Sequence, residues 1–205
     1  MDRGQVAARQ VRGNQLRQAV KDAGLLLGIS VGGVTQAATG TLEGDDAMDL
    51  GVAGEIADFV DLRCYDYGGM PPSIAPHWWI EACIRYALEK KNVPPQNMTA
   101  GLATFSAHWP DAAAVPSDQM TYAQAIAFVK EAGAQIEWVE SDDNGSVLES
   151  RAQVGQGAVW LTDEKTYRAG LDLVQRYGLL GNTMFAAGLG SEAQWEEMAN
   201  WQKSR

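Results

Sequence analysis

The side chains best suited to do chemistry are aromatic and acidic residues at the ends of predicted strands. Three strand ends supply them: Tyr65, Asp66 and Tyr67; Phe105, His108 and Trp109; and Phe185. Aromatic rings beside a carboxylate suit a sugar, because its apolar faces stack on rings while its hydroxyl and amide groups form hydrogen bonds. The alternative interpretation is a packed aromatic core in which Asp66 caps a loop.

Other familiar chemistries have no motif in this chain. The sequence contains no Gly-x-Gly-x-x-Gly after a strand, no phosphate-binding Gly-Lys-Ser/Thr and no Gly-x-Ser-x-Gly elbow. We therefore expect no cofactor.

No metal site is expected either. Cys64 and Cys83 lie on apolar stretches separated by a strand and a loop, which indicates buried thiols rather than a zinc pair or a disulfide framework. His77 and His108 have no legible partner nearby, which favours a structural or surface role. Residues 142–144 lack the spaced ligands of a calcium loop, so they predict a solvated turn.

Length and charge narrow the classes of function further. The chain has 205 residues, of which 46% are apolar, and a formal net charge of -10. A core of ordinary size is therefore expected, and an acidic surface repels phosphate backbones, which excludes nucleic acid as a partner. No run approaches the roughly 20 apolar residues of a membrane span, and the first residues lack a signal-type apolar run. As written, the chain is not addressed for secretion.

Apolar periodicity predicts the elements that position these side chains. Four strands alternate with amphipathic helices, which is typical of an α/β protein with a parallel sheet. The predicted strands are 25–31, 59–65, 98–105 and 181–187, and the predicted helices are 14–23, 50–57, 80–89, 122–132, one after 163 and one after 191. The first strand is apolar on both faces, which suits a parallel strand covered by helices better than an exposed antiparallel one. Since the carboxyl ends of parallel strands face the ligand, the candidate residues should converge.

A second, smaller unit interrupts this alternation. Three short β-type segments, 135–140, 146–151 and 158–161, are separated by turn sequences, and Asn144-Gly145 is a good hairpin signal. We interpret 117–161 as a small α+β insertion and 1–116 with 162–205 as the framework. Residues 106–109 are assigned to the loop that precedes the insertion.

Several of these segments together resemble glycoside hydrolase family 18. Residues 57–66 resemble its sixth barrel strand, whose usual form is Asp-x-Val-x-Leu-Met-x-Tyr-Asp, while 98–109 and 177–185 look like its seventh and eighth strands. The insertion and 159–174 are similar to the bacterial branch that cuts peptidoglycan, including spore-cortex N-acetylglucosaminidases. The resemblance covers about residues 15 to 200.

The resemblance implies a (β/α)8 TIM-type barrel and substrate-assisted hydrolysis of β-1,4-linked N-acetylglucosamine in peptidoglycan or chitin. In this mechanism the N-acetyl carbonyl of the substrate attacks the anomeric carbon. By position, Tyr65 would hydrogen-bond the acetyl group, and Asp66 would orient the sugar. Substrate contacts would come from Tyr67, Phe105 and Trp109, with Phe185 in place of a tryptophan that floors the pocket. A full-length protein that follows the family would act in the cell envelope or outside the cell.

The sequence departs from the family in three ways. The Asp-x-x-Asp-x-Asp-x-Glu motif that carries the general acid is absent, and Arg63, Phe105 and Phe185 replace the usual methionine, tyrosine and tryptophan. Four framework strands are predicted where a barrel needs eight. We therefore expect strands five to eight only, with open edges that predict partial opening, self-association or a missing N-terminal half.

Three hypotheses follow from these observations. The leading one is a family-18-like glycosidase whose ligand is an N-acetylglucosamine-containing polysaccharide. A non-catalytic, lectin-like barrel remnant is the alternative, because the general-acid motif is absent. The third is an α/β fragment without independent function.

Overall fold

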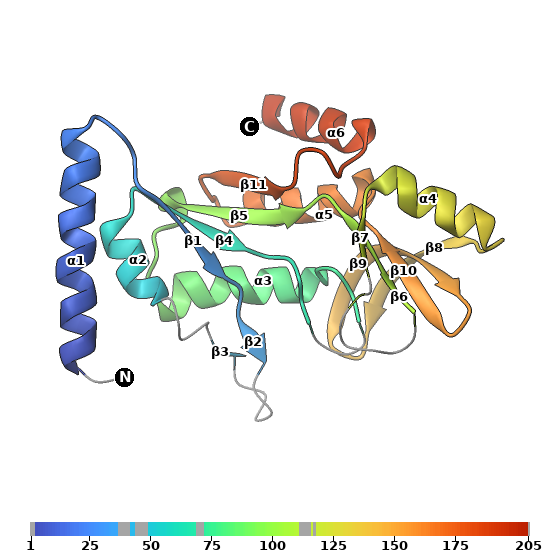
Figure 1. Cartoon of the computed structure of the whole chain (residues 1–205), viewed down its shortest axis with the longest axis horizontal. Helices are drawn as coiled ribbons and strands as arrows, with labels where there is room; N and C mark the ends of the chain where they lie inside the picture. The colour runs from blue at the N-terminus through green and yellow to red at the C-terminus, as the bar shows by residue number, and fades with distance from the viewer. Residues whose placement is uncertain are drawn as a thin grey trace.

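A parallel sheet of four strands forms the centre of the protein (Figure 1). The structure is a computed structural model that describes residues 3–36, 42–43, 49–68, 72–110, 116 and 118–204. The strands are β1 (Gly28–Gly32), β4 (Phe59–Arg63), β5 (Met98–Ala103) and β11 (Gly181–Phe185), hydrogen-bonded in that order. All three pairings are parallel. The four predicted framework strands are therefore present, in the mixed α/β fold that was expected.

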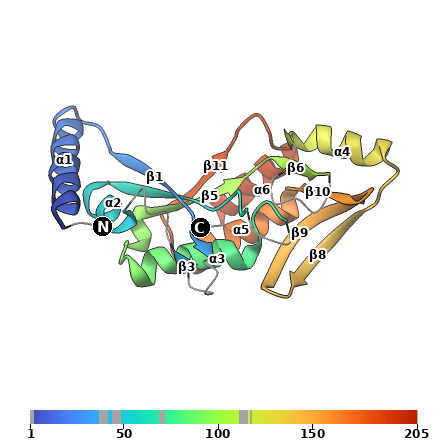
Figure 2. The same ribbon diagram turned by 60° about the horizontal axis from the view of Figure 1, so that its bottom comes forward.

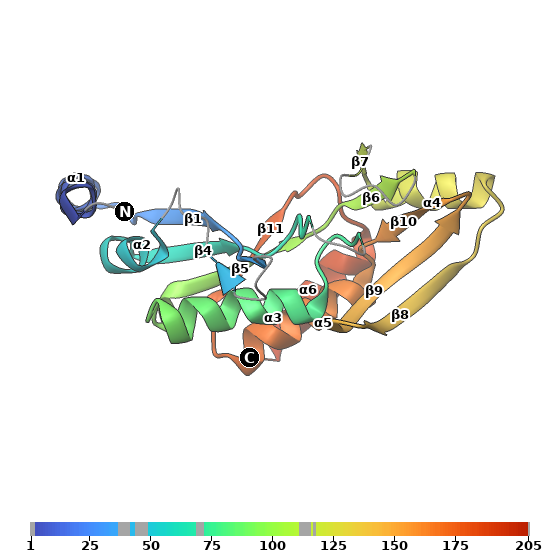
Figure 3. The same ribbon diagram turned by 90° about the horizontal axis from the view of Figure 1, so that it is seen from below.

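Helices cover one face of this sheet (Figure 3). Helix α2 (Leu50–Ile56) connects β1 to β4, and α3 (His77–Arg85), extended by the π-helical turn Tyr86–Lys90 and followed by the 3-10 turn Pro95–Asn97, leads to β5. Helix α5 (Glu164–Arg176) precedes β11, and α6 (Glu192–Lys203) follows it. The long α1 (Arg3–Asp22) packs beside α2, at the left of Figure 1. Among the described helices, none lies over the opposite face of the sheet.

The core lies between this sheet and its helices. In β4, Val60 and Leu62 are buried while Phe59 and Asp61 are half-buried. Successive side chains therefore point alternately into the core and toward the uncovered face of the sheet. Ile84 of α3 and Leu171 of α5 are also buried in this core. The alternation positions the odd-numbered side chains of β4 on an open surface.

The first strand is parallel, as predicted, but the helical cover expected for it lies on one face only. Ser30 of β1 is exposed, and Leu25 and Leu26 just before the strand are 64% and 75% exposed. The reason is topological, because β1 is an edge strand that pairs only with β4 and helices lie on one face only.

A second sheet is antiparallel and packs beside the first (Figure 2). Its strands, in spatial order, are β7 (Asp118–Met120), β6 (Ser106–Trp109), β10 (Gly157–Leu161), β9 (Gly145–Val154) and β8 (Ile136–Asp142). Helix α4 (Tyr122–Glu131), which begins with a capping box at Thr121, packs Ala125 and Val129 against this sheet. A third, minor pair joins β2 (Thr35–Gln36) to β3 (Leu42–Glu43).

This sheet corrects one assignment and confirms another. Residues 106–109 form a strand rather than a loop, because they pair antiparallel with β10, placing Ala107 opposite Trp160. The predicted hairpin at Asn144-Gly145 is present, and its turn is held by the Asp142 carboxylate, which accepts from both backbone N–H groups at 2.8 and 3.1 Å.

Cys64 and Cys83 are free and fully buried, so the prediction of core thiols is confirmed. Within the part of the chain that the structure describes, no helix is both long and apolar enough to cross a lipid bilayer.

Candidate functional site

Three aromatic rings meet at the carboxyl ends of adjacent parallel strands. Tyr65 follows β4, Phe105 follows β5 and Phe185 ends β11. The rings of Tyr65 and Phe185 are stacked, with centroids 5.5 Å apart and planes at 18°. Phe105 meets both edge-on, at 6.3 and 6.2 Å. The parallel topology therefore brings together side chains that are far apart in the sequence.

The three rings differ in accessibility. Phe105 is 1% exposed, whereas Phe185 is 43% exposed and Tyr65 is half-buried. The Tyr65 hydroxyl forms no hydrogen bond with any described residue. Burial raises the pKa of Tyr65 above its usual value, so this hydroxyl stays protonated and can donate to a ligand.

Asp66 lies beside this cluster in an unusual backbone conformation. Its φ of 61° is left-handed, which aspartate adopts more readily than most residues. The side chain is exposed. Partial desolvation raises the pKa of its carboxyl group, and the guanidinium of Arg63 opposes that shift.

Two hollows flank Asp66. The polar hollow, of about 180 Å³, is lined by Gly32, Gly33, Val34, Arg63, Tyr65, Asp66, Tyr67 and Trp79. The apolar hollow, of about 300 Å³, is lined by Asp66, Gly68, Ser73, Ile74, Phe105, Trp109 and Pro116. Trp109 is 4% exposed, and its Nε1 has no acceptor among the described residues.

Tyr67 is not part of the ring cluster. Its ring packs edge-on against Trp78 and Trp79 of α3, at 5.4 and 5.6 Å. Tyr67 therefore forms a wall of the polar hollow together with Trp79.

The two histidines lie apart from the rings. His108 of β6 contacts the Phe128 ring of α4 at 4.9 Å. His77 is buried at the start of α3, where its Nδ1 lies 2.9 Å from the Ser146 hydroxyl, and burial lowers its pKa. Over the described ranges, no cluster of three or more His, Cys, Asp or Glu side chains could hold a metal ion.

Two carboxylates near the site were missed from the sequence. Asp61 accepts from Ser30 and Thr99 at 3.0 and 3.1 Å and also from Thr183, so it links all four parallel strands on their open face. Glu149 of β9 is buried beneath the segment that lines the apolar hollow. A polar residue within the apolar run 59–65 was a signal for Asp61, whereas nothing local distinguishes Glu149.

The comparisons with known proteins agree with this architecture. No protein-family model matches the chain. It is 25% identical over 156 residues to the cortical fragment-lytic enzyme of Bacillus subtilis (strain 168), covering 73% of this chain and 36% of that relative. A chitinase from Chromobacterium violaceum has a TM-score of 0.77 at 23% identity, over 96% of this chain and 61% of that one. The spore cortex-lytic enzyme SleL of Bacillus megaterium has a TM-score of 0.75 at 20% identity, over 95% and 45%.

These similarities confirm the resemblance that the strand motifs indicated. The chain shares its fold with chitinases and spore cortex-lytic enzymes, which is consistent with a TIM-barrel type, and its sequence is similar to that of a cortical fragment-lytic enzyme. The chain spans 36% of the length of that relative.

Proposed function

We propose that this chain is a family-18-like glycosyl hydrolase component that binds β-1,4-linked N-acetylglucosamine in peptidoglycan or chitin at the carboxyl ends of its parallel strands. The observation that carries the proposal is the stacked pair of Tyr65 and Phe185 beside Asp66, with the Tyr65 hydroxyl free of described partners. Rings and a carboxylate in this arrangement suit a neutral, hydroxyl-rich ligand. The names of the similar proteins support the same class of substrate.

Each site residue has a role in this proposal. The Tyr65 hydroxyl donates to the acetamide carbonyl and holds it for attack on the anomeric carbon, and the Asp66 carboxylate accepts from a sugar hydroxyl. The exposed Phe185 ring stacks on the sugar face. Phe105 and Trp109 form the apolar hollow for the adjoining part of the ligand, and Tyr67 forms the wall of the polar one.

Hydrolysis also needs an acid that protonates the leaving group. We assign this acid to a barrel strand other than the four parallel strands described here. In this proposal β1, β4, β5 and β11 correspond to strands five to eight of a barrel, built from 1–116 and 162–205, and the α+β insertion occupies 117–161. The antiparallel pairing of β6 brings residues 106–109 into the sheet of the insertion as well.

The open edges of the parallel sheet require cover in this arrangement. The exposed Leu25 and Leu26 precede β1, and Leu180, which is 50% exposed, precedes β11. We infer that either the first half of the barrel or a second copy of the chain covers them, because unpaired strand edges tend to associate.

A lectin-like role is the second candidate. The observation that favours it is Arg63, a charged side chain in the polar hollow where the family usually has methionine. In that case the site holds a saccharide without turning it over.

Substitution of Tyr65 by phenylalanine tests the proposal. Tyr65→Phe removes only the hydroxyl, so affinity for N-acetylglucosamine oligomers, measured by calorimetric titration, should fall about tenfold. Tyr86→Phe is the matched control, because that half-buried tyrosine lies outside the two hollows. Unchanged affinity of Tyr65→Phe contradicts the assigned role, and no binding by the unmodified chain rejects the proposal. A parallel hydrolysis assay on the complete protein separates the candidates, since binding without turnover favours the lectin-like one.

A further inference from the structure

Glu149 is a buried carboxylate that the proposed sugar contacts do not use. It is 1% exposed, and no other Asp or Glu among the described residues is buried. Its carboxylate accepts from the Ser73 hydroxyl and, at 3.0 Å, from the Ala75 backbone N–H. No ion pair joins it to a lysine or arginine in the described ranges. Burying a carboxylate without a cation is costly, which calls for a specific role.

A β-bulge places Glu149 in this position. Glu149 lies opposite Val139 and Ser146 lies opposite Ser141, so β9 takes three steps where β8 takes two. Within the extra stretch, Leu148 has a left-handed φ of 55°, which is unfavourable for leucine. Bulges and strained residues of this kind re-aim side chains and cluster beside functional sites.

The segment that Glu149 holds is also part of the candidate site. Ser73 and Ile74 line the apolar hollow, together with Asp66. The carbonyl oxygen of Ile74 accepts from the backbone N–H of Tyr67 at 3.1 Å. One short series of hydrogen bonds therefore joins the antiparallel sheet to the turn that carries Asp66.

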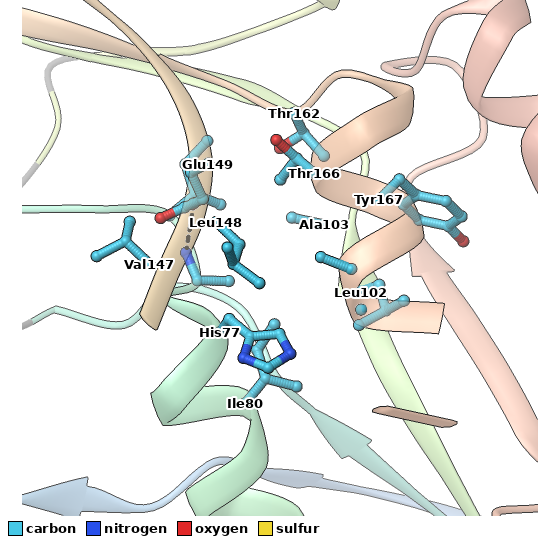
Figure 4. A pocket seen from close by; sticks show the side chains of 14 residues that line it. His77, Ile80, Leu102, Ala103, Val147, Leu148, Glu149, Thr162, Thr166 and Tyr167 are labelled. Carbon is cyan, nitrogen blue, oxygen red and sulfur yellow. Dashed lines mark hydrogen bonds between the residues drawn. The ribbon is translucent and has the colours of Figure 1, made fainter. Parts of the chain in front are cut away.

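We propose that Glu149 is a positioning residue of the candidate sugar site, which fixes the segment 73–75 and through it the turn at Asp66 and Tyr67. This inference takes only the identity of the ligand, a sugar, from the proposed function. Glu149 itself does not touch the sugar. The cavity it shares with His77 and Tyr167 holds about 20 Å³, which is room for one water molecule (Figure 4).

Ionisation of Glu149 gives the positioning a measurable signature. The titratable groups around it are Asp142 on β8, His77 on α3 and Tyr167 on α5. Burial raises the pKa of Glu149 to about 7, and the hydrogen bonds from the segment 73–75 only partly offset that shift. When the segment 73–75 is packed over Glu149, the neutral carboxyl group is therefore favoured. When the segment moves away and water hydrates Glu149, that preference is lost. Raising the pH through about 7 should loosen the segment.

The test compares Glu149→Ala and Glu149→Gln with the unmodified chain, and Glu140→Gln, an exposed glutamate of the same sheet, is the control. Amide hydrogen exchange at Tyr67 and Ala75 is the first measurement. Glu149→Ala should speed exchange at both amides about tenfold at a given pH, whereas Glu140→Gln should leave it unchanged. The uncharged Glu149→Gln should keep both amides protected. The ratio of the exchange rate in the unmodified chain to that in Glu149→Gln should increase from near pH 5 to near pH 8.

Titration with N-acetylglucosamine oligomers is the second measurement. A folded Glu149→Ala variant should bind about tenfold more weakly, and Glu149→Gln should restore most of the affinity. Unchanged exchange at Tyr67 and Ala75 in folded Glu149→Ala overturns the proposal, as does unchanged sugar affinity in a variant whose segment has loosened. If Glu149→Ala does not fold, a pH-independent ratio of exchange rates between Glu149→Gln and the unmodified chain overturns it. If the unmodified chain binds no oligomer, the proposed function fails, while exchange still decides whether Glu149 fixes the turn.

Discussion

At the scale of single residues, the site depends on where each strand stops. Tyr65 and Asp66 lie two and three residues beyond Arg63, the last residue of β4, and Asp66 takes a left-handed conformation. Phe185 ends β11, so its ring is free to stack on Tyr65 and still be 43% exposed. These side chains are accessible because strand ends, unlike strand centres, are not enclosed by neighbours on both sides.

Glu149 also gives a residue-scale prediction for stability. Its pKa rises from 4.5 to about 7 on folding, so between these values the folded chain binds more protons than the unfolded chain. The free energy of unfolding should therefore fall as the pH rises through this range, by about 3 kcal/mol in total. Glu149→Gln should remove that fall, as measured by urea unfolding near pH 5 and near pH 8. Glu140→Gln should follow the unmodified chain, and an equal fall in Glu149→Gln would assign the pH dependence to other groups.

At the scale of elements, the close approach of β10 to β6 shapes the apolar hollow. Gly157 begins β10 against the end of β6, where a Cβ would overlap the carbonyl oxygen of Trp109 and the backbone of Pro110. Only glycine fits this approach without displacing the backbone. Because Trp109 lines the apolar hollow, strand packing and site geometry are linked at this point.

Gly157→Ala is the corresponding prediction. The variant should lose about 2 kcal/mol or more of stability in urea unfolding, because the overlap is with backbone that cannot turn aside. Gly181→Ala in β11 is the matched control, since its Cβ would meet nothing within 4 Å. That variant should stay within about 0.5 kcal/mol of the unmodified chain. Equal stability of the two variants would show that β6 and β10 can separate at little cost.

At the scale of the whole molecule, both sheets contribute residues to the candidate site. The parallel sheet supplies the strand ends that carry Tyr65, Asp66 and Phe185, and the antiparallel sheet supplies Trp109 and the buried support from Glu149. One face of the parallel sheet is not covered by any described helix (Figure 3). Asp61 and its hydrogen-bond partners Ser30 and Thr99 lie on that face. A barrel arrangement would enclose this face, and the strands that complete the barrel would pair with the two open edges of the sheet.

The sheet edge provides a test of self-association. If a second copy covers β1, the apparent mass in light scattering should rise with concentration, and Leu26→Lys should return it to that of a monomer. Leu16→Lys is the control, because Leu16 is similarly exposed but lies on α1. A mass that stays monomeric at every concentration would reject the second copy and leave further barrel strands as the cover.

The sequence by itself determined the framework strands, the hairpin at Asn144-Gly145 and the strand ends where Tyr65, Phe105 and Phe185 meet. These features follow from local periodicity and turn chemistry, together with the rule that parallel strands present their carboxyl ends on one side. Only the tertiary structure decided the pairing of residues 106–109 with β10 and the exposure of β1, because partners distant in the chain fix both. The tertiary structure also decided the burial of Glu149. One extra residue in β9 changes which side chains face inward, and no local sequence pattern predicts that bulge.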